Sequence, residues 1–139
     1  MWTQSVDLHS HSTNSDGEHS VEFVAGLMKE SGVQVWSLTD HDTIAGWKTG
    51  EESANTLDMT FIPGVELTCE RGMEPNVDEL RRNKRERASR SWHLLAYFPN
   101  LKHTDDNAVK FARWLKPLQK NRLPRMKKMV KKLTELGMP

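Results

Sequence analysis

The chain has 139 residues, of which 36% are hydrophobic and 28% charged, and its formal net charge is +1. This length and composition are those of a single soluble globular domain and exclude a disordered protein. No apolar run approaches the ~20 residues needed to cross a bilayer, and the N-terminus lacks the basic and apolar regions of a signal peptide. The single cysteine, Cys69, excludes an internal disulfide, so we expect a cytoplasmic protein without a membrane partner.

The charges are distributed unevenly along the chain. Residues 1–69 carry two lysines against eleven acidic residues, whereas residues 70–139 carry eighteen lysines and arginines against eight acidic residues. A site that holds both metal cations and an anionic substrate would produce this asymmetry. Solvated charged faces explain it equally well.

Short apolar segments alternate with helix-like segments in chain order. Strands are predicted at residues 5–8, 33–39, 60–68 and 92–98. The first helix is predicted to begin after Ser20 and to stop at Gly32, and a weaker helix covers residues 43–55. Asp105 or Asp106 is predicted to cap a further helix, and Pro117 and Pro124 are expected to interrupt it before a last amphipathic stretch. This alternation indicates an α/β domain with a largely parallel sheet or barrel.

The segment 70–90 is strongly charged, with seven basic and five acidic residues and few apolar ones. It is predicted to be an exposed insertion. Its basic cluster, at residues 81–87, either faces solvent or attracts nucleic acid. Because four strands make an incomplete barrel, we expect the chain to be the N-terminal part of a longer domain.

Histidine and carboxylate residues follow several of the predicted strands. In extended backbone His9 and His11 project to the same side, ~7 Å apart, although such a pair alone is often just polar loop residues. His41 and Glu66 also lie at the C-terminal ends of apolar strands, where α/β folds place their sites. The convergence of three strand ends predicts a metal site.

Two further residues fit this site less directly. His93 comes early in its strand, but it would meet Glu66 if strands 60–68 and 92–98 pair antiparallel. The alternative is that His93 is simply a histidine near the start of a strand, without a role in the site. Asp16 precedes Gly17 in a turn, where aspartate is also common for purely local reasons.

The motifs together resemble those of the PHP superfamily, named for polymerase and histidinol phosphatase. They are Asp7-Leu8-His9-Ser10-His11, Ser15-Asp16-Gly17, Thr39-Asp40-His41-Asp42-Thr43, Pro63-Gly64-Val65-Glu66 and His93-Leu94-Leu95. The resemblance covers essentially the whole chain. The first two motifs are most similar to a branch that includes nucleoside 3′,5′-bisphosphate phosphatases and exonucleases acting on short RNA.

The resemblance implies a distorted, TIM-like (β/α)₇ barrel with two to three divalent metal ions. His9 and His11 would hold one metal, which Glu66 would bridge to a second metal bound by His93. Asp16 and His41 would hold the third. The family's remaining ligands, a histidine and a later Asp-x-His pair, have no counterpart in this chain.

A metal-dependent phosphoesterase is the function that the resemblance implies. A metal-activated hydroxide would hydrolyse phosphate monoesters or diesters of nucleotides or short oligonucleotides. The histidine and carboxylate ligands fit Mn²⁺, Zn²⁺ or Fe²⁺. The alternatives are a histidinol-phosphate phosphatase with the same metal site and a non-catalytic fragment that binds metal or nucleic acid.

Several residues beside the ligands are candidates for other roles. Besides Glu66, we expect Asp40 and Asp42 to act in catalysis, either by orienting imidazoles or by accepting a proton. The alternative is that both are helix-capping or solvated carboxylates. Arg122 and Arg125 are candidates for binding the substrate phosphate through paired N–H donors, or else simply face water.

Overall fold

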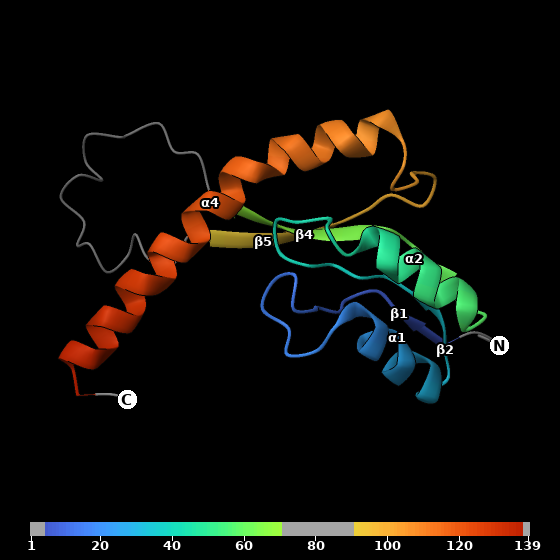
Figure 1. The fold of residues 1–139 in the computed structure, drawn as a ribbon, viewed down its shortest axis with the longest axis horizontal. Coiled ribbons are helices and arrows are strands. Elements are labelled where there is room, and N and C mark those ends of the chain that lie inside the picture. Colours follow the sequence, from blue (N-terminus) through green and yellow to red (C-terminus); the bar gives the residue numbers. More distant parts are fainter. Residues whose placement is uncertain (1–4, 71–90, 138–139) are drawn as a thin grey trace.

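A computed structural model describes residues 5–70 and 91–137 of the protein (Figure 1). The predicted insertion therefore lies outside the described residues, except for Glu70 at the end of a strand. No helix in the described part is long and apolar enough to cross a membrane. The elements in chain order are β1 (Ser5–Asp7), α1 (Val21–Glu30), β2 (Val33–Trp36), α2 (Trp47–Thr56), β3 (Thr60–Phe61), β4 (Gly64–Glu70), β5 (Ser91–Tyr97) and α4 (Asp106–Glu135).

The first three strands form a parallel sheet in the order β1-β2-β3. The helices α1 and α2 connect successive strands and lie next to each other (Figure 1). Parallel strands require such crossover connections, so the predicted α/β class is confirmed. The strands of the described part form this sheet and one hairpin, and the (β/α)₇ barrel stays a prediction.

The region 60–68 is two strands, and the prediction of one continuous strand is wrong. β3 pairs with β2, whereas β4 pairs antiparallel with β5. The pairing partner changes at Pro63: Ile62 donates its N–H to the Trp36 carbonyl at 2.8 Å, and the Pro63 carbonyl accepts from Phe98 at 2.8 Å. Beyond Pro63 a parallel contact with the β2 side persists at Glu66, which bridges to His41, while the other edge of β4 pairs with β5.

The first helix agrees with its predicted signals. The Ser20 side chain accepts a hydrogen bond from the Phe23 N–H, and Gly32 has a φ of +78° just beyond the helix end. The second helix begins later than predicted, at Trp47. Its N-cap is Gly46, which has no side chain to cap the free N–H groups.

The helix α4 is continuous from Asp106 to Glu135, so the predicted interruption at Pro117 and Pro124 is wrong. The two prolines are seven residues apart, about two helical turns, and therefore lie on the same side of the helix. Both are exposed, so water can bind the carbonyls that lose their N–H partners. The helix changes direction near its middle (Figure 1), as proline-containing helices do.

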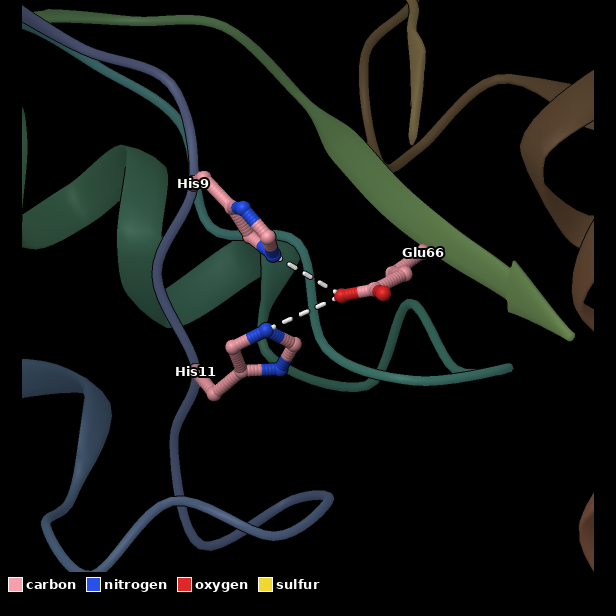
Figure 2. A group of neighbouring side chains, drawn as sticks. All are labelled: His9, His11 and Glu66. Atoms are coloured by element: carbon pink, nitrogen blue, oxygen red, sulfur yellow. Dashed lines mark hydrogen bonds and ion pairs between the residues drawn. The ribbon is translucent and has the colours of Figure 1, made fainter. Parts of the chain in front are cut away.

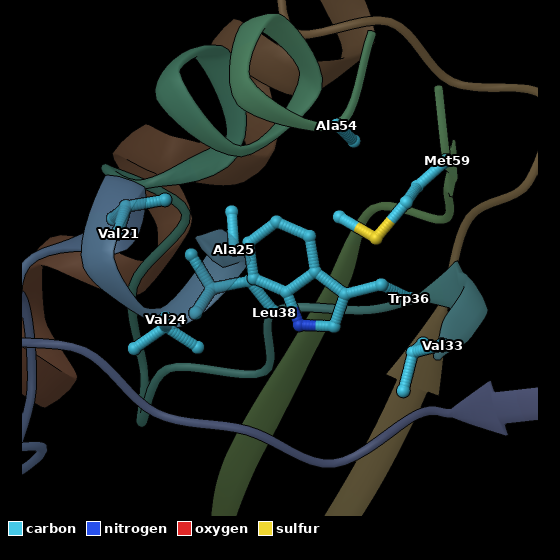
Figure 3. Close-up of a cluster of buried hydrophobic side chains, with 8 residues drawn as sticks. All are labelled: Val21, Val24, Ala25, Val33, Trp36, Leu38, Ala54 and Met59. Atoms are coloured by element: carbon cyan, nitrogen blue, oxygen red, sulfur yellow. The ribbon is translucent and has the colours of Figure 1, made fainter. Parts of the chain in front are cut away.

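A hydrophobic core lies between the parallel sheet and the helices α1 and α2. Trp36 is fully buried at its centre (Figure 3). The indole N–H of Trp36 donates to Ser10 Oγ at 2.9 Å, which ties the core to the segment that follows β1. The buried cluster consists of Val21, Val24, Ala25, Val33, Trp36, Leu38, Ala54 and Met59.

We predict that Trp36→Ala lowers the free energy of unfolding by about 3–5 kcal/mol, because it leaves a cavity in this core. Urea denaturation monitored by circular dichroism would measure the change. Trp92→Ala is the matched control, since Trp92 is 67% exposed and surface changes usually stay within about 0.5 kcal/mol. Equal losses in the two variants would contradict the placement of the core.

Candidate metal centre

The predicted ligand residues come from three segments of the chain that meet at one edge of the fold. His9, His11 and Asp16 follow β1, and His41 follows β2. The hairpin β4–β5 carries the other two predicted ligands, one on each strand. The structure thus gathers all six residues, which are far apart in the sequence.

The Glu66 carboxylate occupies the centre of this group and is only 5% exposed. One of its oxygens, Oε2, lies 2.9 Å from His9 Nε2 and 3.1 Å from His11 Nε2 (Figure 2). The other oxygen, Oε1, lies 2.8 Å from His93 Nδ1. Each oxygen thus faces a different set of imidazoles, as a carboxylate that bridges two metal ions would.

Asp16 joins two of the imidazoles from the opposite direction. Its Oδ1 lies 3.4 Å from His11 Nδ1, and its Oδ2 lies 3.3 Å from His41 Nε2. The centroid of the His41 ring lies 4.8 Å from that of His11 and 4.7 Å from that of His93. The aspartate of the Asp-Gly turn therefore faces the same cluster.

The nitrogen and oxygen atoms are spaced as ligands of common ions are. Three groups each have ligand atoms within 4.8 Å of one another: His9–His11–Glu66, His11–Asp16–His41 and His41–Glu66–His93. Ligands that each bind one ion at ~2.0–2.2 Å lie at most about 4.4 Å apart, so small movements bring each group to coordination distance. The residues present fit divalent metals, and their mixed nitrogen and oxygen donors suit Mn²⁺, Zn²⁺ or Fe²⁺.

The imidazoles also determine the charge of the carboxylate at the centre. Burial raises the pKa of Glu66, whereas the hydrogen bond with His9 and the positive charges of His41, His11 and His9 lower it. The lowering effects together outweigh burial, and the pKa of Glu66 falls below its ordinary value. Glu66 is therefore ionised at neutral pH, which is the form that binds a cation.

Backbone hydrogen bonds extend beyond the strands and connect the three ligand-bearing segments. The Thr39 N–H donates to the Ser10 carbonyl at 2.8 Å, joining the segments after β1 and β2. His41 and Glu66 form a parallel bridge, in which the Asp42 N–H donates to the Glu66 carbonyl at 2.9 Å. The ligands are thus attached to a continuous ladder of backbone contacts.

Asp40 and Asp42 flank His41, and each is only 1% exposed. The Asp40 carboxylate accepts hydrogen bonds from Ser12 and Ser15, and the Asp42 carboxylate accepts hydrogen bonds from Thr68. The alternative that these are solvated carboxylates is therefore wrong. Their participation in catalysis stays a prediction.

Other residues near the site had no signal in the sequence. Ser12 and Thr68 are ordinary hydroxyl residues whose partners lie more than twenty positions away. Gln119 of α4 donates to the Asp42 carbonyl at 2.9 Å and so brings α4 to the site. The side chains of Arg122 and Arg125, the predicted phosphate contacts, lie outside the described part of the structure.

Tyr97 is also near the site and had no signal in the sequence. Its hydroxyl donates to the Leu8 carbonyl at 2.9 Å, which connects β5 to the segment that leads into the His9–His11 pair. Burial raises the pKa of Tyr97, as do the negative charges of Asp7 and Glu66. The phenol therefore stays protonated and keeps donating this hydrogen bond at neutral pH.

Comparison with known proteins agrees with the motifs and with their gathering in space. The PHP domain family matches residues 7–120. The chain belongs to the PHP domain family. The match confirms the resemblance that the five motifs indicated.

The similar proteins include enzymes whose names denote phosphodiester cleavage. A 5′-3′ exoribonuclease of Haemophilus influenzae is 42% identical over 66 residues, which cover 48% of this chain and 24% of the relative. A phosphoribosyl 1,2-cyclic phosphate 1,2-diphosphodiesterase of Eggerthella lenta is 35% identical over 74 residues, which cover 51% of this chain and 28% of the relative. The matched segments thus span about a quarter of the length of these curated relatives.

A solved structure shares the fold. The structure of an amidohydrolase from Chromobacterium violaceum aligns with a TM-score of 0.73 and 24% identity, over 96% of this chain and 40% of that one. At this identity the likeness concerns the fold alone.

We predict that Gly17→Ala weakens Mn²⁺ binding about ten-fold, comparable to the loss of a group that supports a metal ligand. A Cβ at Gly17 would lie 2.6 Å from the backbone carbon and oxygen of His11, so the turn that carries Asp16 would have to move. Isothermal titration calorimetry with the purified chain would measure the affinity.

The matched control for this prediction is Gly26→Ala in α1, where an added Cβ meets nothing within 4 Å. Its Mn²⁺ affinity should be unchanged, and its stability should rise by about 0.5–1 kcal/mol because alanine favours the helix. Native affinity in Gly17→Ala would show that the turn does not position the ligands.

Proposed function

We propose that this chain carries the metal centre of a phosphoesterase that hydrolyses phosphate esters of nucleotides or short oligonucleotides. The observation that supports the proposal is the position of Glu66, whose two oxygens face imidazoles from different segments. A buried carboxylate in this position suits two cations better than one. Family membership supports the same conclusion, because the PHP relatives named above cleave phosphodiester bonds.

Two to three divalent ions fit the gathered residues. His9, His11 and Glu66 would hold one ion, Glu66 and His93 a second, and Asp16 and His41 a third, each set lying within one of the three groups. When bound, such ions supply Lewis acidity, which lowers the pKa of a coordinated water and shields the charge of a phosphate. Mn²⁺, Zn²⁺ and Fe²⁺ all suit this ligand set.

The chain's own residues give the site its charge and its orientation. Histidines bind metals as neutral imidazoles, so Glu66 and Asp16 supply the negative charge of the described ligand set. Two carboxylates do not neutralise two or three divalent cations, so the loaded site would keep a positive charge. A positively charged site attracts an anionic phosphate ester toward the bound metal ions.

The substrate class is proposed from the relatives and from the helix that reaches the site. The H. influenzae relative is named as an exoribonuclease, and it is 42% identical over the 66 matched residues. The helix α4 contacts the site through Gln119 and carries Arg122 and Arg125 within the next two turns. Arginines so placed would bind substrate phosphates through paired N–H donors.

A phosphate-release assay with Mn²⁺ tests this function on the complete gene product that contains the chain. Nucleoside 3′,5′-bisphosphates and short RNA should release phosphate or nucleotides, and histidinol phosphate should not react. Turnover of histidinol phosphate alone would instead identify a histidinol-phosphate phosphatase. Metal binding without turnover of any substrate would identify a non-catalytic metal-binding domain.

We predict that His9→Ala and Glu66→Ala each lower turnover by more than about 100-fold, beyond the usual effect of residues that only support a metal ligand. The physical reason is the loss of a ligand at the centre of the cluster. His103→Ala is the matched control, because His103 pairs with Glu51 at 2.7 Å and belongs to none of the three ligand groups. Unchanged turnover in Glu66→Ala would refute the site.

A further inference from the structure

The two aspartates beside His41 make the same pair of contacts in two different places. Asp40 accepts from the Ser12 N–H and from Ser12 Oγ, both at 2.7 Å, with one oxygen for each donor. Asp42 accepts from the Thr68 N–H and from Thr68 Oγ1, both at 2.8 Å, again with one oxygen for each. Each aspartate therefore holds one hydroxyl residue through both its backbone and its side chain.

We propose that Asp40 and Asp42 are positioning residues, each of which fixes a different ligand-bearing segment to the segment of His41. The inference rests on the proposed function, because it assumes that the gathered side chains bind metal. It assigns the two carboxylates a role other than accepting a proton. Their contacts with Ser12 and Thr68 are here called the Asp40 clamp and the Asp42 clamp.

The Asp40 clamp holds the turn between two ligands. Ser12 directly follows His11, and Ser15, which also donates to Asp40 at 2.7 Å, directly precedes Asp16. The Ser12 carbonyl in turn accepts from the Ser15 and Gly17 N–H groups, both at 3.0 Å. Fixing Ser12 therefore fixes the turn that presents His11 and Asp16.

The Asp42 clamp holds the hairpin that carries the other ligands. Asp42 has a φ of +53°, a conformation that aspartate adopts more readily than most residues. Thr68, which it holds, lies two residues after Glu66 and directly opposite His93 in the β4–β5 register. Fixing Thr68 therefore fixes the part of the hairpin that presents Glu66 and His93.

Burial explains why these carboxylates position residues instead of exchanging protons. A buried carboxylate is costly unless hydrogen bonds compensate for the lost water, and here two short bonds reach each aspartate from one residue. A proton acceptor must reach the reacting water within about 2.6–3.2 Å. The oxygens of Asp40 and Asp42 instead face Ser12 and Thr68, which belong to the supporting chain segments.

The two clamps predict separate effects on separate ligands. Ser12→Ala removes one hydrogen bond from the Asp40 clamp and should loosen the group His11–Asp16–His41. Thr68→Val removes one hydrogen bond from the Asp42 clamp with little change in side-chain shape, and it should loosen the group His41–Glu66–His93. The two groups share His41 but differ in their other ligands.

A Zn²⁺ titration of the chain, followed by NMR of the histidine ring ¹⁵N nuclei, would measure the response of each imidazole separately. In Ser12→Ala, the His11 signal should respond at about ten-fold higher Zn²⁺ than in the unaltered chain, with little change for His93. In Thr68→Val, the His93 signal should show the shift of about ten-fold, and the His11 signal should shift less, because Glu66 also contacts His11. Each variant thus serves as the control for the other.

Further variants separate positioning from folding. Thr68→Ser keeps the hydroxyl and should bind Zn²⁺ as the unaltered chain does. If Ser12→Ala fails to fold, Ser15→Ala removes another bond to Asp40 and should affect the His11 signal with little change for His93. The amide NMR spectrum without Zn²⁺ reports whether each variant is folded.

The outcomes distinguish this inference from the proposed function. Native Zn²⁺ responses in both variants, or an equal loss for His11 and His93 in each, would overturn the positioning role while leaving the metal site intact. If the imidazoles of the unaltered chain do not respond to Zn²⁺, the proposed metal centre fails, and the inference fails with it.

Discussion

The contact between the buried Glu66 carboxylate and its surrounding imidazoles is the interaction on which the rest of the site depends. A carboxylate withdrawn from water needs positive charge or hydrogen bonds nearby, and histidines from three segments provide both. Because the carboxylate is ionised at neutral pH, it attracts cations into the space that the imidazoles enclose. The geometry that stabilises the charge without metal is thus the geometry that a metal would use.

The pairing of both edges of β4 determines that Glu66 reaches this position. On one edge of β4, Glu66 pairs in parallel with His41, beyond the end of β2, through hydrogen bonds with Asp40 and Asp42. On its other edge β4 joins β5 as an antiparallel hairpin. Antiparallel pairing brings the start of β5 to the end of β4, so His93 meets Glu66 although 27 positions separate them in the sequence. The two edges of β4 therefore bring the segments of His41 and His93 to the same carboxylate.

The sequence predicted the gathered residues better than the elements that carry them. Histidines and carboxylates at strand ends followed from simple strand geometry, and so did the meeting of Glu66 with His93. The division of the strand could have been predicted from Pro63, because proline rarely lies within a central strand. The continuity of α4 could not be predicted from the sequence, since it depends on the exposure of Pro117 and Pro124 to solvent. Ser12 and Thr68 could not be identified, because a distant hydrogen bond leaves no periodic pattern.

The hydrophobic core and the candidate metal centre are mechanically connected through Ser10. This residue lies between His9 and His11, and its hydroxyl accepts from the buried Trp36 indole and donates to the Ser37 carbonyl at 3.0 Å. Its own carbonyl accepts from the Thr39 N–H, close to His41. Movement of Trp36 would therefore displace both ligand-bearing segments at once. The apolar burial around Trp36 therefore also keeps the imidazoles in place, so a change that moves Trp36 should lower stability and metal binding together.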